Sequence, residues 1–360
     1  MAAYAAQYVH TIVPFLALEL NGWAFIQFCS SQRKMAVMPI ATATGAVTHL
    51  ALIGLFVFVF DWGFTGICWA TALLFVAKFL AVQVYILCNR RELKTFEDVT
   101  FFSRETFSNL GPMIRVCTMS MFMGIWGWWA FDIFTFMATY LGETSAAAQS
   151  ILRSLGLLTF MLPVGYSSAI QILGGNSIGA AKPNLAMQYY KVCMFMACII
   201  TIFQMSVLWF AQGPLISMYT NQPDIAALME SAWPILIIFT FFDTTQAMGQ
   251  SVIRATGKQG LGALITGTAY FAVGIPFSYW MAFSKGQDIR GLWWGPTLAT
   301  AYNTLWYNVI IFRIDWPALI RENKERKAKE IALREELKRQ EALEQGDDFE
   351  KAGDAPNTIQ

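Results

Sequence analysis

Long apolar stretches alternate with short polar breaks along most of this chain of 360 residues. Nine of the stretches are long enough to form helices of roughly 20 residues, the length that crosses about 30 Å of hydrocarbon. These expected spans cover residues 8–30, 37–60, 66–88, 109–139, 145–171, 188–211, 227–253, 259–283 and 291–313. Turn-forming residues such as Gln212-Gly213-Pro214 separate them. The pattern predicts an all-α polytopic membrane protein.

Composition supports that prediction. Hydrophobic residues make up 56% of the chain and charged residues 14%, whereas soluble domains carry about 25% charged residues. The charge is concentrated at the C-terminal end, where glutamates precede lysines and arginines at helical spacing over about 315–345. We therefore expect residues 316–360 to form a charged tail outside the membrane, helical at first and disordered at its end.

The distribution of basic residues predicts the orientation in the membrane. One set of alternate loops holds ten lysines and arginines, and the opposite set holds only Lys285 and Arg290. Cytosolic loops carry an excess of these residues. We therefore expect the basic loops and the C-terminus in the cytosol and the N-terminus on the other face.

Other functional classes find little support. The six cysteines occur singly, without the spacing of a zinc site, and the chain has only two histidines. No segment resembles a phosphate-binding loop, a nucleophile with its base, or a nucleic-acid-binding surface. We expect neither an enzyme nor a metal, cofactor or nucleic-acid partner. The lipid bilayer is the expected environment.

A small-residue segment at 161–183 is the most informative part of the sequence. It reads MLPVGYSSAIQILGGNSIGAAKP, and small residues allow helices to approach closely. In this order the segment resembles the signature at the end of the eighth helix of multidrug and toxic compound extrusion (MATE) transporters. The positions that we assign to this structural motif are Pro163, Gly165, Gly175, Asn176 and Gly179.

The resemblance covers most of the chain and points to the eukaryotic branch. Residues 1–36 resemble the fourth family helix, and residues 251–276, with Gly257, resemble the junction between helices ten and eleven. Family members have about twelve helices in two lobes of six, so the resemblance implies that the first three are missing here. The implied domains are a partial N-terminal lobe (1–88), a cytosolic linker (89–104), a complete C-terminal lobe (105–315) and the tail (316–360).

Two aspartates lie within expected spans. A carboxylate there costs about 2.5–3.5 kcal/mol on insertion scales and marks a functional candidate, although it can also serve to cap a break in a helix. Asp243 and Asp132 match family acids of helices ten and seven, which implies that they couple cations to protons. Burial favours their protonated form. Gly127 stands where eukaryotic members carry a further carboxylate.

Basic and polar neighbours bear on the same site. Arg153 can pair with Asp132 or Asp243 and so compete with a substrate. Aromatic rings beside a carboxylate suit an organic cation. The expected cavity-lining residues are Trp128, Trp129, Thr244, Gln246 and Arg153.

Two further charges, Glu19 and Lys78, lie within the spans of the N-terminal part. They can pair with each other, reach the membrane surface, or pair across an interface with another membrane subunit that completes the lobe.

The resemblance implies a secondary transporter that exports organic cations or xenobiotics in exchange for H⁺, with Na⁺ the less favoured ion, in the plasma or vacuolar membrane. Two alternatives stay open. One is a transport-incompetent structural membrane subunit, favoured by the missing helices, Gly127, Arg153 and Lys78. The other is an incomplete gene model of an ordinary antiporter.

Overall fold

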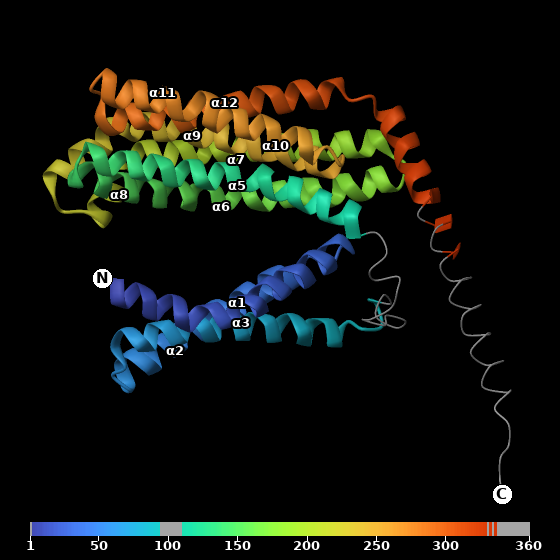
Figure 1. Cartoon of the computed structure of the whole chain (residues 1–360), viewed down its shortest axis with the longest axis horizontal. Helices are drawn as coiled ribbons and strands as arrows, with labels where there is room; N and C mark the ends of the chain where they lie inside the picture. The colour runs from blue at the N-terminus through green and yellow to red at the C-terminus, as the bar shows by residue number, and fades with distance from the viewer. Residues whose placement is uncertain (1, 94–109, 330, 333–334, 337–360) are drawn as a thin grey trace, which may run out of the picture. The chain divides into compact units, whose positions relative to one another are not determined.

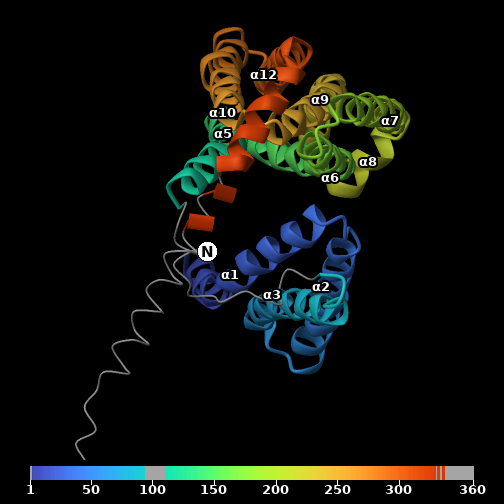
Figure 2. The same ribbon diagram turned by 90° about the vertical axis from the view of Figure 1, so that its right-hand side faces the viewer.

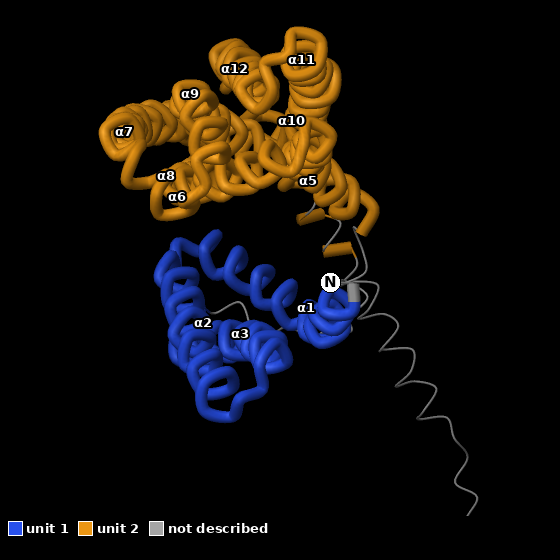
Figure 3. The backbone as a smooth tube through the Cα atoms, turned by 90° about the vertical axis from the view of Figure 1, so that its left-hand side faces the viewer, with its two compact units in different colours: residues 1–102 blue, residues 103–360 orange. Residues whose placement is uncertain are grey.

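The computed structural model describes residues 2–93, 110–329, 331–332 and 335–336. The described residues are almost entirely helical, and the chain divides into two compact units, 1–102 and 103–360 (Figures 1 and 3). The expected all-α class is confirmed. Most of the linker expected at 89–104 and the disordered end expected for the tail lie outside the described residues.

The described part of the first unit contains three long helices. They are α1 (Ala2–Ser31), α2 (Val37–Ile53), which continues as the π-helical segment η1 (Gly54–Val59), and α3 (Gly63–Cys88). The helix α3 packs against both α1 and α2.

The two charges inside this unit pair with each other. Lys78 Nζ contacts Glu19 Oε1, and Trp23 Nε1 donates a hydrogen bond of 2.9 Å to the same oxygen. Of the roles left open for Lys78, the structure shows mutual pairing, which neutralises both side chains without another subunit.

The second unit is a larger bundle. Its elements are α5 (Leu110–Leu141), α6 (Glu143–Gly179), α7 (Pro183–Phe210), α8 (Gln212–Tyr219), α9 (Pro223–Ala255), α10 (Gln259–Gly267), η3 (Thr268–Gly274), α11 (Ile275–Tyr279), η4 (Trp280–Ser284) and α12 (Asp288–Arg313). Beyond α12, residues 316–329 form one more helix. Its Lys327 Nζ donates a hydrogen bond of 3.1 Å to Gly179 O at the end of α6.

Within the described residues, eight helices are long and apolar enough to cross a membrane. The expected ninth span corresponds to α12, which has 26 residues but lower hydropathy. The reason is that α12 turns polar and aromatic groups into the bundle. Trp293 Nε1 donates to Gln149 Oε1 at 2.9 Å, and Tyr307 OH lies 2.6 Å from Thr266 Oγ1.

The helix α9 is the centre of the second unit. It packs against α6, α7 and α12, and Figure 2 shows it between them. Half of its most apolar stretch is buried, compared with 6% for the span that contains α2. Buried Trp233, Leu236 and Phe239 join α9 to the main core. Side chains on α9 are therefore held in place from several sides.

The close helix contact that the small-residue motif predicted occurs elsewhere. At Gly165 and Gly175 a Cβ atom would meet nothing within 4 Å among the described residues, and Asn176 and Gly179 simply continue α6 through the segment. Backbones meet instead at Gly291 and Gly295 of α12. Near Gly179 only the Lys327 Nζ atom comes within 4 Å, so these glycines of the motif make no close contact with a neighbouring backbone.

Gly257 ends α9 with a left-handed turn. Its φ is +77°, Gly257 N–H bonds Arg254 O, and Lys258 N–H bonds Ile253 O. This pattern is a Schellman cap, which favours glycine because a Cβ is strained at positive φ. Gly257 therefore has a conformational role that the resemblance alone did not specify.

The expected span 259–283 is continuous but not regular. It passes from α10 through η3, α11 and η4, and both η segments are π-helical. Wide turns of this kind are frequent at functional sites. Tyr270, which lies in η3, lines the cavity described next.

Candidate functional site

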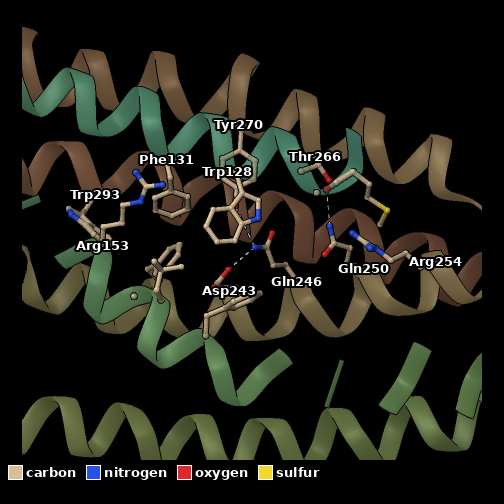
Figure 4. Close-up of a pocket in the computed structure, with 17 residues that line it drawn as sticks. Trp128, Phe131, Arg153, Asp243, Gln246, Gln250, Arg254, Thr266, Tyr270 and Trp293 are labelled. Atoms are coloured by element: carbon tan, nitrogen blue, oxygen red, sulfur yellow. Dashed lines mark hydrogen bonds between the residues drawn. The ribbon is translucent and has the colours of Figure 1, made fainter. Parts of the chain in front are cut away.

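A cavity of about 270 Å³ lies inside the second unit (Figure 4). The helices α5, α6 and α9 supply most of its wall, and α10, η3 and α12 supply one residue each, Thr266, Tyr270 and Trp293. Aromatic rings from five elements, α5, α6, α9, η3 and α12, form much of the surface. Such a mostly apolar cavity with a few polar groups is typical of a small-molecule site.

The polar groups of the cavity lie largely on one face of α9. Asp243, Gln246, Gln250 and Arg254, which we call the polar stripe, all line it. Their spacing of three, then four, then four residues places them on one side of a helix. Figure 4 shows them in succession along α9.

Asp243 has a neutral partner. Gln246 Nε2 donates a hydrogen bond of 2.7 Å to Asp243 Oδ1, and Asn303 Nδ2 on α12 donates one of 2.8 Å to Gln246 Oε1. This chain of amides fixes the direction of the Gln246 side chain. In the described part of the chain no lysine or arginine pairs with Asp243, so its charge remains available to a ligand.

Asp132 has different surroundings. Arg153 Nη1 lies 2.8 Å from Asp132 Oδ1, and the Asp132 side chain is 54% exposed. Arg153 lines the cavity, whereas Asp132 does not. The pairing expected for Arg153 is therefore found, with Asp132 rather than Asp243 as its partner. The carboxylate of Asp132 is therefore already paired with an arginine.

Trp129 and Thr244, expected to line the cavity, do not. Trp129 lies one position past Trp128, which does line it, and turns away to pack edge-on against Trp126 at 5.7 Å between ring centroids. Thr244 faces α7, where Thr201 Oγ1 donates to its hydroxyl at 3.1 Å. A shift of one residue turns a side chain by about 100° around a helix, which explains both differences.

Gly127 lines the cavity opposite Tyr270. A Cβ at this position would lie 3.5 Å from the Tyr270 ring, an ordinary contact. The motif residues Pro163, Gly165, Gly175, Asn176 and Gly179 of α6 and Gly257 after α9 lie outside the cavity wall.

The sequence reasoning missed Arg254. Arg254 is one of the ten basic residues in the charge count of the alternate loops, because it lies just before Gly257. The structure shows instead that it belongs to the last turn of α9 and lines the cavity. Its position three helical turns beyond Asp243 on the same face was the available signal.

The cavity can hold an organic ion, but the described residues contain no group of three or more metal-ligating side chains. Asp243 supplies a negative charge, Gln246 and Gln250 supply amides, and Trp128, Phe131 and Tyr270 supply rings. Ring faces attract cations.

Comparison with known proteins agrees with this architecture. Residues 120–280 match the MatE family model. Mouse "Multidrug and toxin extrusion protein 2" is 26% identical over 88% of this chain and 55% of its own length. "Protein DETOXIFICATION 36" of Arabidopsis thaliana is 26% identical over 88% of this chain and 63% of its own. The chain thus spans little more than half the length of these relatives.

Solved structures support the fold. The eukaryotic MATE transporter AtDTX14 superposes with a TM-score of 0.80 at 22% identity, covering 87% of this chain and 70% of that one. An outward-facing multidrug resistance MATE family transporter gives 0.74 at 16% identity, covering 89% and 70%. The helical architecture, the matched model and these relatives agree: the chain is a multi-pass membrane protein, and it is similar to transporters of the MATE family.

Proposed function

We propose that this chain exports organic cations in exchange for protons, with Asp243 as the carboxylate that both ions share. One observation carries the proposal: among the described residues, Asp243 is the carboxylate that lines the cavity, and its partner is an amide. Asp132 has no equal role in this proposal, because Arg153 already pairs with it.

The exchange follows from competition for one group. An ionised Asp243 attracts a cation held between the rings of Trp128, Phe131 and Tyr270. A proton on the same carboxylate removes that charge, so the cation leaves. When the proton departs, the site regains its affinity. Gln246, oriented by Asn303, keeps the carboxylate in position in both states.

The orientation is part of the proposal. One set of alternate expected loops holds ten lysines and arginines, one of them Arg254 at the end of α9, against two on the other side, so in this proposal that set and the C-terminus face the cytosol. Protons then enter from an acidic outer or vacuolar side while cations leave the cytosol, so the plasma or vacuolar membrane is the proposed location. H⁺ is preferred to Na⁺ as the coupling ion because the sequence resembles the eukaryotic branch of the family.

The test is ethidium uptake into proteoliposomes that are acidic inside. Wild-type protein should accumulate ethidium until the gradient is collapsed, and Asp243→Asn should not. Asp224→Asn is the matched control, since Asp224 lies exposed in the first turn of the same helix. Equal uptake by wild type and Asp243→Asn would contradict the proposal. Ethidium uptake by neither would favour a structural subunit that does not transport.

A further inference from the structure

The polar stripe ends in a second charge. Arg254 lines the cavity at the last turn of α9, and a Cβ added to Gly124 of α5 would lie 3.6 Å from its Nη2 atom. The guanidinium group therefore lies over the α5 backbone at Gly124, which has no side chain. Figure 4 shows it beyond Gln250, at the end of the stripe opposite to Asp243.

Arg254 differs from the other arginine of the cavity. Arg153 has a carboxylate partner in Asp132, whereas no acidic side chain pairs with Arg254 within the described residues. No hydrogen bond joins Gln250 to Arg254 among the described residues, and Gln250 Nε2 donates to Met123 O at 3.0 Å. An unpaired charge in a low-dielectric wall is costly, and ligand binding is one way to offset that cost.

We infer that the cavity binds an elongated ion with a cationic group at one end, held by Asp243, and a carboxylate, sulfate or phosphate at the other, held by Arg254. The inference rests on the proposed function, because it assigns the substrate class of the same cavity. Arginine suits this role because its guanidinium group binds a carboxylate or phosphate through two parallel hydrogen bonds.

The geometry of α9 limits the length of such a ligand. Asp243 and Arg254 are eleven positions apart on α9. At a rise of 1.5 Å per residue, their backbones are about 16 Å apart along the helix axis. The side chain of an arginine is longer than that of an aspartate and leans toward the N-terminal end of its helix, so the two charges lie closer than that. Figure 4 shows Trp128 and Tyr270 near Asp243 and the amides of Gln246 and Gln250 on the way to Arg254, so an aromatic section of the ligand fits beside its cationic group.

A simpler role for Arg254 is to stabilise the C-terminal end of α9, where the helix dipole favours a positive charge. That role and ligand binding predict different things. A purely structural arginine affects the binding of every ligand alike, whereas an anion-binding arginine favours the ligand that carries an anionic group.

The experiment compares two probes that differ only at one end. The first is a rigid biphenyl with an aminomethyl group at one end and a carboxylate at the other, and the second is its methyl ester. Their dissociation constants are measured by tryptophan fluorescence with the full chain in nanodiscs. The variants are Arg254→Gln, Arg254→Lys and Asp243→Asn, and Arg290→Gln is the matched control, exposed at the start of α12.

Wild type should bind the acid at least about tenfold more tightly than the ester, the range expected for a hydrogen bond to a charged group. Arg254→Gln should abolish this preference by weakening the binding of the acid. Arg254→Lys should keep part of the preference, and Arg290→Gln all of it. Asp243→Asn should weaken both probes.

Different negative results would contradict different claims. If the wild type shows no preference for the acid, or Arg254→Gln retains it, the inference is wrong, while weaker ester binding by Asp243→Asn still supports the proposed function. If neither probe binds to the wild type, the inference fails, and ethidium uptake decides the proposed function separately. The wild-type preference can be measured even if Arg254→Gln does not fold.

Discussion

Two aspartates within membrane-spanning helices, Asp132 on α5 and Asp243 on α9, differ in what surrounds them. Asp132 lies 2.8 Å from a guanidinium nitrogen and is more than half exposed, whereas Asp243 lines a cavity and accepts a hydrogen bond from an amide. A carboxylate paired with arginine gains little from a further cation. Asp243 is therefore the residue on which the proposed exchange depends.

Replacing each aspartate by asparagine separates their roles. In Asp243→Asn we expect the dissociation constant of tetraphenylphosphonium to rise at least tenfold, because a charged partner is lost from a low-dielectric site. In Asp132→Asn the change should stay within about twofold, the usual effect of substitutions away from a site. Equilibrium dialysis with the radiolabelled cation measures both. A larger loss in Asp132→Asn would return the central role to that residue.

The sequence identified some of these residues better than others. Asp243 and Gln246 stand out because charged and amide groups are costly within an apolar span. The exclusion of Trp129 and Thr244 from the cavity wall depends on the rotation of each helix about its axis, which aromatic and threonine-rich segments leave undefined. Arg254 was missed because the sequence alone does not show how far α9 extends before Gly257.

At the scale of helices, contact between α12 and the η3–α11–η4 segment holds one side of the cavity. A Cβ at Gly295 would lie 2.4 Å from Gly274 O and still nearer to Ser278 Oγ. A Cβ at Gly291 would lie 2.6 Å from the Met281 carbonyl carbon. Small residues four apart allow this approach. Trp293, between them, lines the cavity.

Gly295→Ala should therefore destabilise the protein by about 1–3 kcal/mol, the usual effect of overpacking. Gly175→Ala is the matched control, because nothing lies within 4 Å of its Cβ position. It should change little or stabilise by up to about 1 kcal/mol, since alanine favours helices. The measurement is thermal unfolding in detergent, followed by tryptophan fluorescence. An unchanged melting temperature for Gly295→Ala would show that the contact is less tight than described.

Most helices were predictable from apolar length alone, because a membrane span must be long and apolar. Bounds were less predictable. The helix α6 runs on through Gly174 and Gly175 to Gly179, since glycine can continue a helix that neighbours support. The helix α12 was the span least evident from apolar length, because its hydropathy is low. Its polar groups are tolerated because they find partners such as Gln149 inside the bundle.

For the whole molecule, orientation relative to the membrane decides which way substrates move. In the proposed topology, charge asymmetry between alternate loops predicts Lys258 in the cytosol and Asn221 outside or in the vacuolar lumen. Both positions lie in turns between helices and are exposed. Neither the fold nor the family likeness specifies this direction by itself.

Cysteine labelling tests the orientation. In intact cells or vacuoles with the proposed topology, Asn221→Cys and Lys258→Cys should react with a membrane-impermeant maleimide from opposite sides. If the protein lies in the plasma membrane of intact cells, Asn221→Cys should react at once. Lys258→Cys should then react only after the cells are permeabilised. The unsubstituted chain controls for its six native cysteines. The reverse pattern would place the C-terminus outside and contradict the proposed direction of export.

The central claim is that a cation and a proton compete for Asp243. The most direct measurement is proton release when tetraphenylphosphonium binds to purified protein in weakly buffered solution, followed with a pH indicator at a series of pH values. At acidic pH the carboxylate begins protonated, so wild type should release up to one proton per cation bound, and release should decline as the pH rises. Asp243→Asn should release none. Cation binding by wild type without proton release at any pH, or equal release by Asp243→Asn, would contradict the account.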